Sequence, residues 1–158
     1  MPFLPTPSEL TARARADLRV GLPVILGGEG AGLVLLAAET LQPHRLEALR
    51  NLGDPVLAIT GRRAETLKAR AYDGDLARLI LPEGADAGWV RAVADPADDL
   101  RVPMKGPLIS ARQGGADLHR LAITLVKSAQ LLPAVLAVAV PDAAGFAERV
   151  HLTRLVPE

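Results

Sequence analysis

The glycine-rich stretch GGEGAG, residues 27–32, is the first candidate for chemistry because such stretches can cradle phosphate groups. A phosphate-binding loop of that kind ends in Lys-Ser or Lys-Thr, or opens a helix whose N-terminal amides face the anion. This stretch does neither, since it leads into an apolar run at residues 33–38. We therefore predict a mobile β-hairpin connection, in which glycines supply the positive φ angles of a tight reversal.

Metal ligands are the second candidate. The chain has three histidines, which lie far apart in the sequence: His44, His119 and His151. None has a second histidine or a carboxylate at metal-ligand spacing on one helix face, so we expect all three to face solvent. Asp95, Asp98 and Asp99 carry carboxylates suited to a hard cation, but their setting is typical of a polar turn. We expect no metal site and no cofactor.

Two short basic spots are the third candidate. Lys105, Arg112, Gly114 and Gly115 combine cationic side chains with flexible backbone and could contact a phosphate group. A solvated loop explains the same residues. The residues by themselves indicate no catalytic group, because no nucleophile, base and orienting partner recur at a known spacing.

The composition argues against several classes of function, among them nucleic-acid and membrane binding. The chain has 158 residues, 49% of them hydrophobic, with 18 basic and 18 acidic residues and no cysteine. This length suits one domain, and the balanced charge gives no footprint for nucleic acid or anionic lipid. The N-terminus lacks a signal-peptide pattern, and the apolar run 131–141 is too short to span a membrane. We expect a cytoplasmic protein that binds neither nucleic acid nor membrane.

Apolar periodicity predicts helices alternating with short strands, the pattern of an α/β layered domain. We expect a Pro-containing arm at residues 1–12 and one domain at 13–158. Ser8 is the expected cap of the first helix, which Gly21 ends. The other expected helices are 43–50, 61–69, 87–94, 118–132 and 143–149, and the expected strands are 23–26, 33–38, 55–59, 76–81, 134–140 and 151–156.

Residues 13–156 resemble 3,4-dihydroxy-2-butanone 4-phosphate synthase, the magnesium-dependent riboflavin-pathway lyase that acts on ribulose 5-phosphate. ADLRVGLPVIL at 16–26 is similar to the family's AIEDIRxGxxVVV, and GLVLLAAE at 32–39 to GDLVMAAE. The helix 121–133 and the following AVL resemble AAVDLARLAGLxPAGVI, and the segment 141–148 resembles LPDLEAFAEEHGL. The resemblance implies a three-layer domain with a mixed sheet covered by helices.

The chain departs from the family where the family carries its acids. The family's acidic loop DDEDRENEGD corresponds to the shortened stretch 27–32, in which Glu29 is the one carboxylate. The metal-binding histidine of the family's GHTEA corresponds to Leu118, with His119 one position out of step. The glutamate of the family's VICE corresponds to Ala139. The resemblance therefore implies that lyase activity has been lost.

The family is dimeric and in many bacteria is fused ahead of GTP cyclohydrolase II, where degenerate copies occur. The resemblance thus implies the N-terminal part of a longer riboflavin-pathway protein, in which this domain forms a homodimer or stabilises a fused or associated cyclohydrolase. Any cyclohydrolase activity would lie in a C-terminal domain. Two alternatives stay open: a module that binds a phosphorylated metabolite, and a residual magnesium-dependent lyase that uses Asp95, Asp98 or Asp99.

Overall fold

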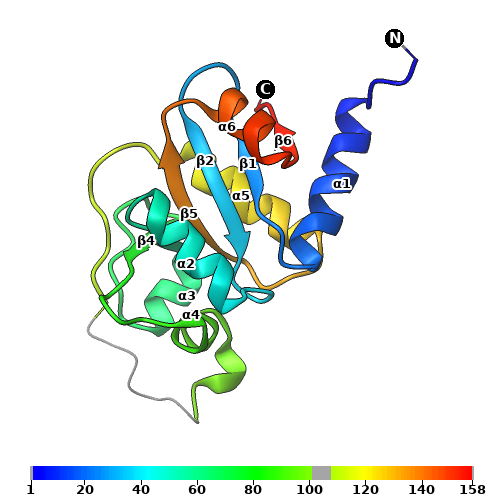
Figure 1. Cartoon of the computed structure of the whole chain (residues 1–158). Helices are drawn as coiled ribbons and strands as arrows, with labels where there is room; N and C mark the ends of the chain where they lie inside the picture. Colours follow the sequence, from blue (N-terminus) through cyan, green and yellow to red (C-terminus); the bar gives the residue numbers. More distant parts are fainter. Residues whose placement is uncertain (1, 101–107, 158) are drawn as a thin grey trace.

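Helices and strands alternate along the chain, as the apolar spacing predicts (Figure 1). The structure is a computed structural model that describes residues 2–100 and 108–157. In chain order the elements are α1 (Pro7–Arg19), β1 (Val24–Leu26), β2 (Gly32–Ala37), α2 (Pro43–Leu52), β3 (Val56–Thr60), α3 (Gly61–Thr66), β4 (Leu76–Ile80), α4 (Ala87–Ala94), the 3-10 turn η1 (Pro96–Asp98), α5 (Asp117–Ser128), β5 (Ala134–Val140), α6 (Ala143–Val150) and β6 (Arg154–Leu155).

The strands form a mixed sheet. Within the described residues its order is β4-β3-β5-β2-β1-β6. The pairs β1–β2, β2–β5, β3–β5 and β3–β4 are antiparallel, and β1–β6 is parallel. The β1–β2 register places Val24 opposite Leu35 and Leu26 opposite Leu33. This mixed sheet confirms the predicted α/β class.

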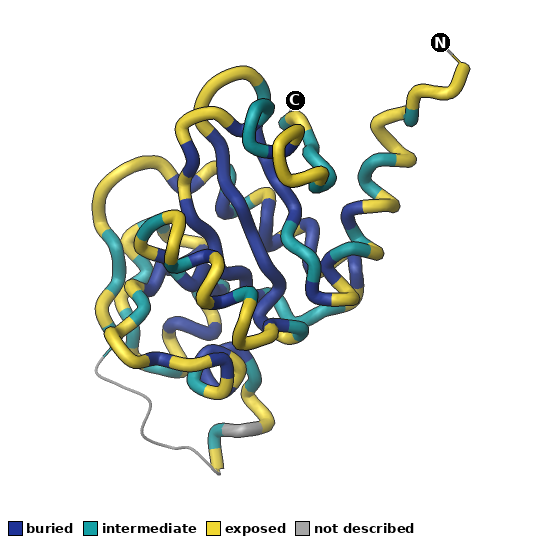
Figure 2. Tube along the Cα trace, in the orientation of Figure 1, coloured by how far each residue is buried: buried dark blue, intermediate teal, exposed yellow. Residues whose placement is uncertain are grey.

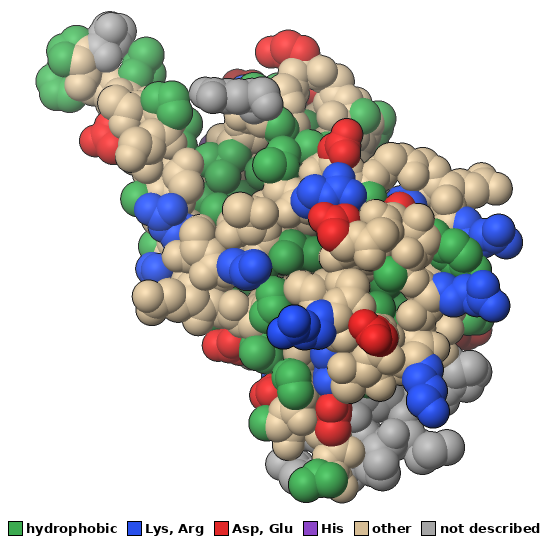
Figure 3. All heavy atoms as spheres, turned by 180° about the vertical axis from the view of Figure 1, so that it is seen from behind, with side chains coloured by type: hydrophobic (Ala, Val, Ile, Leu, Met, Phe, Trp, Pro, Cys, Tyr) green, Lys and Arg blue, Asp and Glu red, His purple; other side chains and the backbone are tan. Residues whose placement is uncertain are grey.

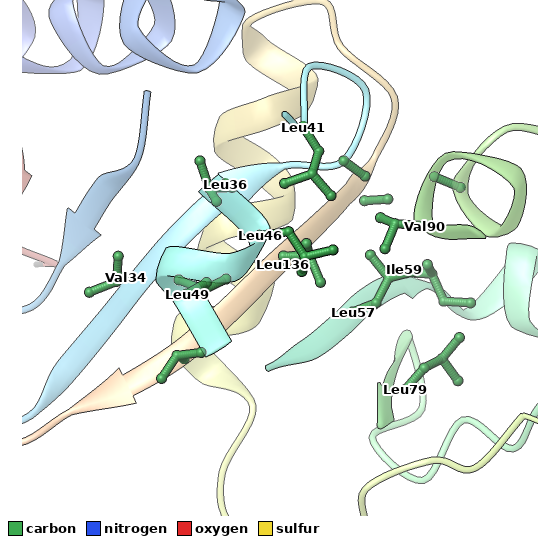
Figure 4. Packing of buried hydrophobic residues seen from close by; sticks show 14 of the residues in the cluster. Val34, Leu36, Leu41, Leu46, Leu49, Leu57, Ile59, Leu79, Val90 and Leu136 are labelled. Carbon is green, nitrogen blue, oxygen red and sulfur yellow. The ribbon is translucent and has the colours of Figure 1, made fainter. Parts of the chain in front are cut away.

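Two separate apolar clusters fill the space on the two faces of the sheet, which gives the molecule three layers. Helices α2, α3, α4 and α6 contribute to one cluster, together with Leu36, Leu57 and Leu136 from the strands (Figure 4). Helices α1 and α5 contribute to the other, with Leu35 and Val135. Every residue of β2 is buried (Figure 2), which explains why its sequence is a continuous apolar run.

The helix ends differ in part from the expected ones. Thr6, and not Ser8, caps α1: its hydroxyl accepts from the Glu9 amide at 3.1 Å, while its own amide donates to the Glu9 carboxylate at 2.8 Å. This capping box starts the helix at Pro7, so residues 7–12 of the expected arm are helical.

No described helix has the length and apolar character that a bilayer-crossing segment requires.

The end of α5 is a second difference. The apolar stripe predicts a helix to residue 132, but α5 ends at Ser128, and Gln130 follows with φ of 63°. The Leu131 amide donates to the Val126 carbonyl at 3.0 Å, a bond that closes the helix end before Pro133. The last strand, expected at 151–156, is only two residues long.

A buried arginine links helices α3 and α4 on one face of the sheet. Arg63 on α3 is 8% exposed, and its guanidinium donates to both carboxylate oxygens of Asp99 at 2.8 Å. It also donates to the carbonyls of Val93 at 2.8 Å and Ala92 at 3.3 Å, at the end of α4. One side chain therefore joins α3 to α4 and to the turn after it, with charge-assisted bonds.

Replacing Arg63 should show how much this contact contributes. We expect Arg63→Met to lower the free energy of unfolding by about 2–4 kcal/mol, because it leaves a carboxylate and two carbonyls without their donor. Arg62→Met is the matched control, since Arg62 is exposed, and should change stability by less than about 0.5 kcal/mol. Urea denaturation of both variants measures the difference, and equal stabilities would contradict the assignment.

Candidate functional site

Two segments meet at the end of the sheet where the sequence resemblance places the family's acids. The connection 27–31 joins β1 to β2, and the β2–β5 register sets Leu33 opposite Ala139, so the end of β5 lies beside it. Helix α5 packs on this sheet and leads by a short turn into β5, so the two run in opposite directions (Figure 1). The first two turns of α5 contact the segment ahead of β4, where Arg120 donates to Asp75 at 2.7 Å.

The glycine stretch is a hairpin connection, as predicted, and its base is held tightly. Gly27 and Gly32 are buried, and a Cβ on Gly32 would meet the Leu26 carbonyl oxygen and lie 2.7 Å from the Ala143 Cβ. The Gly30 carbonyl accepts from the Ala143 amide at 2.8 Å, which ties the connection to the start of α6. These contacts anchor a connection that the sequence suggested would be mobile.

The acidic positions of the resemblance carry no acid here. Ala139 is the one exposed residue of β5 and faces the hairpin end of the sheet with a methyl group. Leu118, in the first turn of α5, is half-buried and packs against the apolar cluster under α1 and α5. Glu29 at the tip of the hairpin is exposed. In the part of the chain that the structure describes, no three His, Asp or Glu side chains gather closely enough to hold a metal ion.

His119 is buried, which corrects the expectation that all three histidines face solvent. It is 9% exposed, and its Nδ1 has no hydrogen-bond partner among the described residues. Burial, followed by the charge of the nearby Arg78 guanidinium, lowers the pKa of His119 to about 4, and the Asp73 carboxylate opposes the shift. His44 and His151 are exposed, as expected.

The charged groups near His119 are Arg78 and its partner Asp73. Its Nε donates to Asp73 at 2.9 Å, and its Nη2 donates to Asp73 and to the Gly114 carbonyl, both at 3.2 Å. The side chain is 6% exposed, so the pair lies largely out of water. His119 thus sits beside an ion pair as a neutral ring, and a proton on it would face the Arg78 cation in a poorly solvated space.

The comparisons with known proteins agree with this geometry. No family model matches the chain. GTP cyclohydrolase-2 of Azospirillum brasilense is 31% identical over 140 residues, which are 85% of this chain and 36% of that protein. The chain thus spans about a third of that relative's length.

Solved structures show the fold. A two-domain 3,4-dihydroxy-2-butanone 4-phosphate synthase from A. baumannii superposes with a TM-score of 0.67 at 16% identity, over 92% of this chain and 55% of that one. The corresponding synthase of Candida albicans superposes with a TM-score of 0.64 at 17% identity, over 92% of both chains. The chain is a domain of the dihydroxybutanone phosphate synthase-like fold.

Magnesium does not fit this dihydroxybutanone phosphate synthase-like domain at the corresponding place. One of the similar synthases was solved in complex with two magnesium ions. Magnesium prefers octahedral coordination by oxygen atoms, with one or more carboxylates among its ligands. Here the hairpin offers Glu29 alone, Ala139 offers a methyl group, and the ring of His119 is buried beside a cation. The donor set for a divalent ion is therefore missing from these positions.

The structure describes three of the four residues that the sequence predicts to contact a phosphate group, and two of these three have other partners in the chain. The Arg112 guanidinium lies 4.7 Å from the centroid of the Tyr72 ring, a cation–π arrangement. The Gly114 carbonyl accepts from Arg78, and a Cβ added at the exposed Gly115 would meet no atom within 4 Å. Lys105 lies outside the described residues. Phosphate binding by this group stays a prediction.

The acidic turn has structural partners. Asp95 accepts from the Ala97 amide at 2.9 Å and so starts η1, while Asp99 binds Arg63. The Asp98 side chain lies outside the described part of the chain. Because Asp95 and Asp99 serve the backbone and an arginine, the turn gives no support to a relocated acid site.

Tight packing at the base of the hairpin can be tested by adding one methyl group. We expect Gly32→Ala to lower the free energy of unfolding by about 1–3 kcal/mol, because the Leu26 carbonyl and Ala143 leave no room for a Cβ. Glu29→Ala, at the exposed tip, should stay within about 0.5 kcal/mol. Thermal and urea unfolding measure both; a harmless Gly32→Ala would contradict the contact with α6.

The buried histidine should make the domain sensitive to acid. Because the pKa of His119 is about 4 in the folded chain and about 6.5 in the unfolded chain, the unfolded state binds more protons between these values. The folded state is therefore unaffected above pH 6.5 and loses stability as the pH falls toward 4, by about 2 kcal/mol at pH 5.

His119→Leu should remove this loss. We expect the free energy of unfolding of wild type to fall by about 2 kcal/mol more than that of His119→Leu between pH 7 and pH 5. His44→Gln controls for the removal of an exposed imidazole. Parallel urea titrations at the two pH values give the comparison, and identical pH dependence in wild type and His119→Leu would show that His119 is not the group responsible.

Proposed function

We propose that this domain is a catalytically degenerate dihydroxybutanone phosphate synthase-like module of a riboflavin biosynthesis protein of the GTP cyclohydrolase II type. Its role is to form a dimer or to stabilise the cyclohydrolase with which it is fused or associated. The observation that carries the proposal is the anchored glycine hairpin 27–31, which stands where the family has its acidic loop. That hairpin has one carboxylate and no space at its base for larger side chains.

Loss of activity follows from the chemistry that such a lyase needs. Rearranging a sugar phosphate requires groups that take up and return protons next to a carbonyl, and a metal ion that polarises it. At the positions that the resemblance aligns with the family's acids and histidine, this chain carries Leu118, Ala139 and the exposed Glu29. His119 is buried near the Arg78–Asp73 ion pair, and burial keeps its ring neutral.

The link to riboflavin biosynthesis rests on two independent similarities. The similar solved structures are 3,4-dihydroxy-2-butanone 4-phosphate synthases, and the curated relative is a GTP cyclohydrolase-2. The two activities occur together in the fusion proteins that the sequence resemblance implies. A domain that keeps this fold without its acids retains a surface for assembly, which supports a stabilising role.

A phosphate-binding role has weaker support. The first turn of α5 carries Asp117, and Arg120 on the next turn is engaged by Asp117 at 2.9 Å and Asp75 at 2.7 Å. The hydrogen bonds that Arg120 donates to the Asp75 carboxylate raise the pKa of Arg120, and this cation is already engaged by the carboxylates of Asp75 and Asp117. Negative charge on this turn disfavours an incoming anion.

The activity test is direct. The purified chain is incubated with ribulose 5-phosphate and magnesium, and formate is measured, with the Candida albicans synthase as the positive control. We expect a rate at least about 10⁴-fold below the control, since both the acid–base groups and the metal ligands are missing. Formate release within tenfold of the control, abolished by Glu29→Ala, would show a working site at the hairpin and overturn the proposal.

A further inference from the structure

An apolar groove lies between α1, α5 and the C-terminal stretch after β6. Its walls come from Leu10 on α1, Leu121 and Leu125 on α5, and Leu155 and Val156 at the C-terminal side, and its volume is about 690 Å³. We call it the α1–α5 groove. Leu121 and Val156 are 44% and 58% exposed. A groove with leucines open to water is typical of a surface that is covered by a partner.

Helix α1 has the geometry of a projecting arm. Ala14 and Leu18, in its C-terminal half, are fully buried against the sheet. The same helical stripe continues through Leu10 to Pro7, but there the helix leaves the body, so Leu10 is half-buried over the groove and Pro7 is exposed (Figures 1 and 2). The apolar stripe thus extends beyond the surface that its own chain provides.

The segment ahead of α1 carries the most exposed apolar side chains at this end. Phe3 is 91% exposed and Leu4 is 66% exposed. Figure 3 shows hydrophobic side chains at this projecting end and on the body beside it. Leu4 precedes Pro5, and a residue before proline is held in an extended conformation. The capping box at Thr6 fixes where the helix begins, so the segment points away from its own groove.

We infer that the α1–α5 groove is filled by Phe3 and Leu4 of a second copy of this chain, with the two arms exchanged across a two-fold axis. The inference rests on the proposed dimerisation role and names its surface. One chain carries both complementary parts, an apolar segment that cannot fold back and an apolar groove open to solvent. A two-fold axis uses each part twice, which is the usual closed arrangement of a homodimer.

Three variants test this arrangement by light scattering and sedimentation equilibrium. The arm variant is Phe3→Ser/Leu4→Ser, the groove variant is Leu121→Ser, and the control is Val20→Ser, which is 72% exposed at the other end of α1. We expect a wild-type dimer, a dissociation constant at least tenfold weaker for the arm and groove variants, and an unchanged value for the control. Circular dichroism checks that each variant is folded.

Mixing the arm and groove variants gives the decisive result. Each homodimer of these variants has no intact arm-in-groove contact, whereas a mixed dimer has one, between the intact arm of one copy and the intact groove of the other. We therefore expect the mixed dimer to form at least tenfold more tightly than either parent. A dimer that tolerates both variants, or no gain on mixing, would overturn the exchanged arm and leave the dimerisation role standing. A monomeric wild type at millimolar concentration would instead overturn the dimerisation role.

Discussion

The central strands β2 and β5 pair along their whole length, and all of their residues except Ala139 are buried; this constraint decides where polar chemistry can occur. Helices cover each face with its own apolar cluster, so any charged side chain in the middle of these strands would lose its hydration without a partner. Polar side chains can therefore reach water only where the strands end. At the hairpin end the described positions include Glu29, Ala139 and Asp142, whose carboxylate caps α6.

The hairpin differs from the family's acidic loop in its packing as well as in its side chains. Gly32 sits against the Leu26 carbonyl, and Gly30 is held by the Ala143 amide, so the short connection is part of the packing of α6. A longer acidic loop would need a different path out of β1 to avoid these contacts. Placing one carboxylate back on this hairpin would therefore restore neither the number nor the position of the ligands that a magnesium ion requires.

Local patterns in the sequence predict the strands, the hairpin and most helices, because each depends on neighbours within a few residues. His119 was missed, although it shares a helical stripe with Ala122 and Val126 and so falls on the buried face of α5. The end of α5 was missed because Gln130 adopts a left-handed conformation that propensity does not favour. The Arg63–Asp99 contact joins residues 36 apart in sequence, and no short-range pattern predicts such a pair.

The two edges of the sheet differ in whether their side chains form hydrogen bonds and ion pairs within the chain. Beside β4, Arg78 and Arg63 are buried and use their donors within the chain, on carboxylates and carbonyls. Beside β6, the α1–α5 groove exposes Leu121 and Val156, which have no polar group to pair and gain by leaving water. A partner at the β4 edge would have to break formed ion pairs, whereas a partner at the β6 edge removes apolar surface at no such cost. This asymmetry supports the α1, α5 and β6 side as the association surface that we propose.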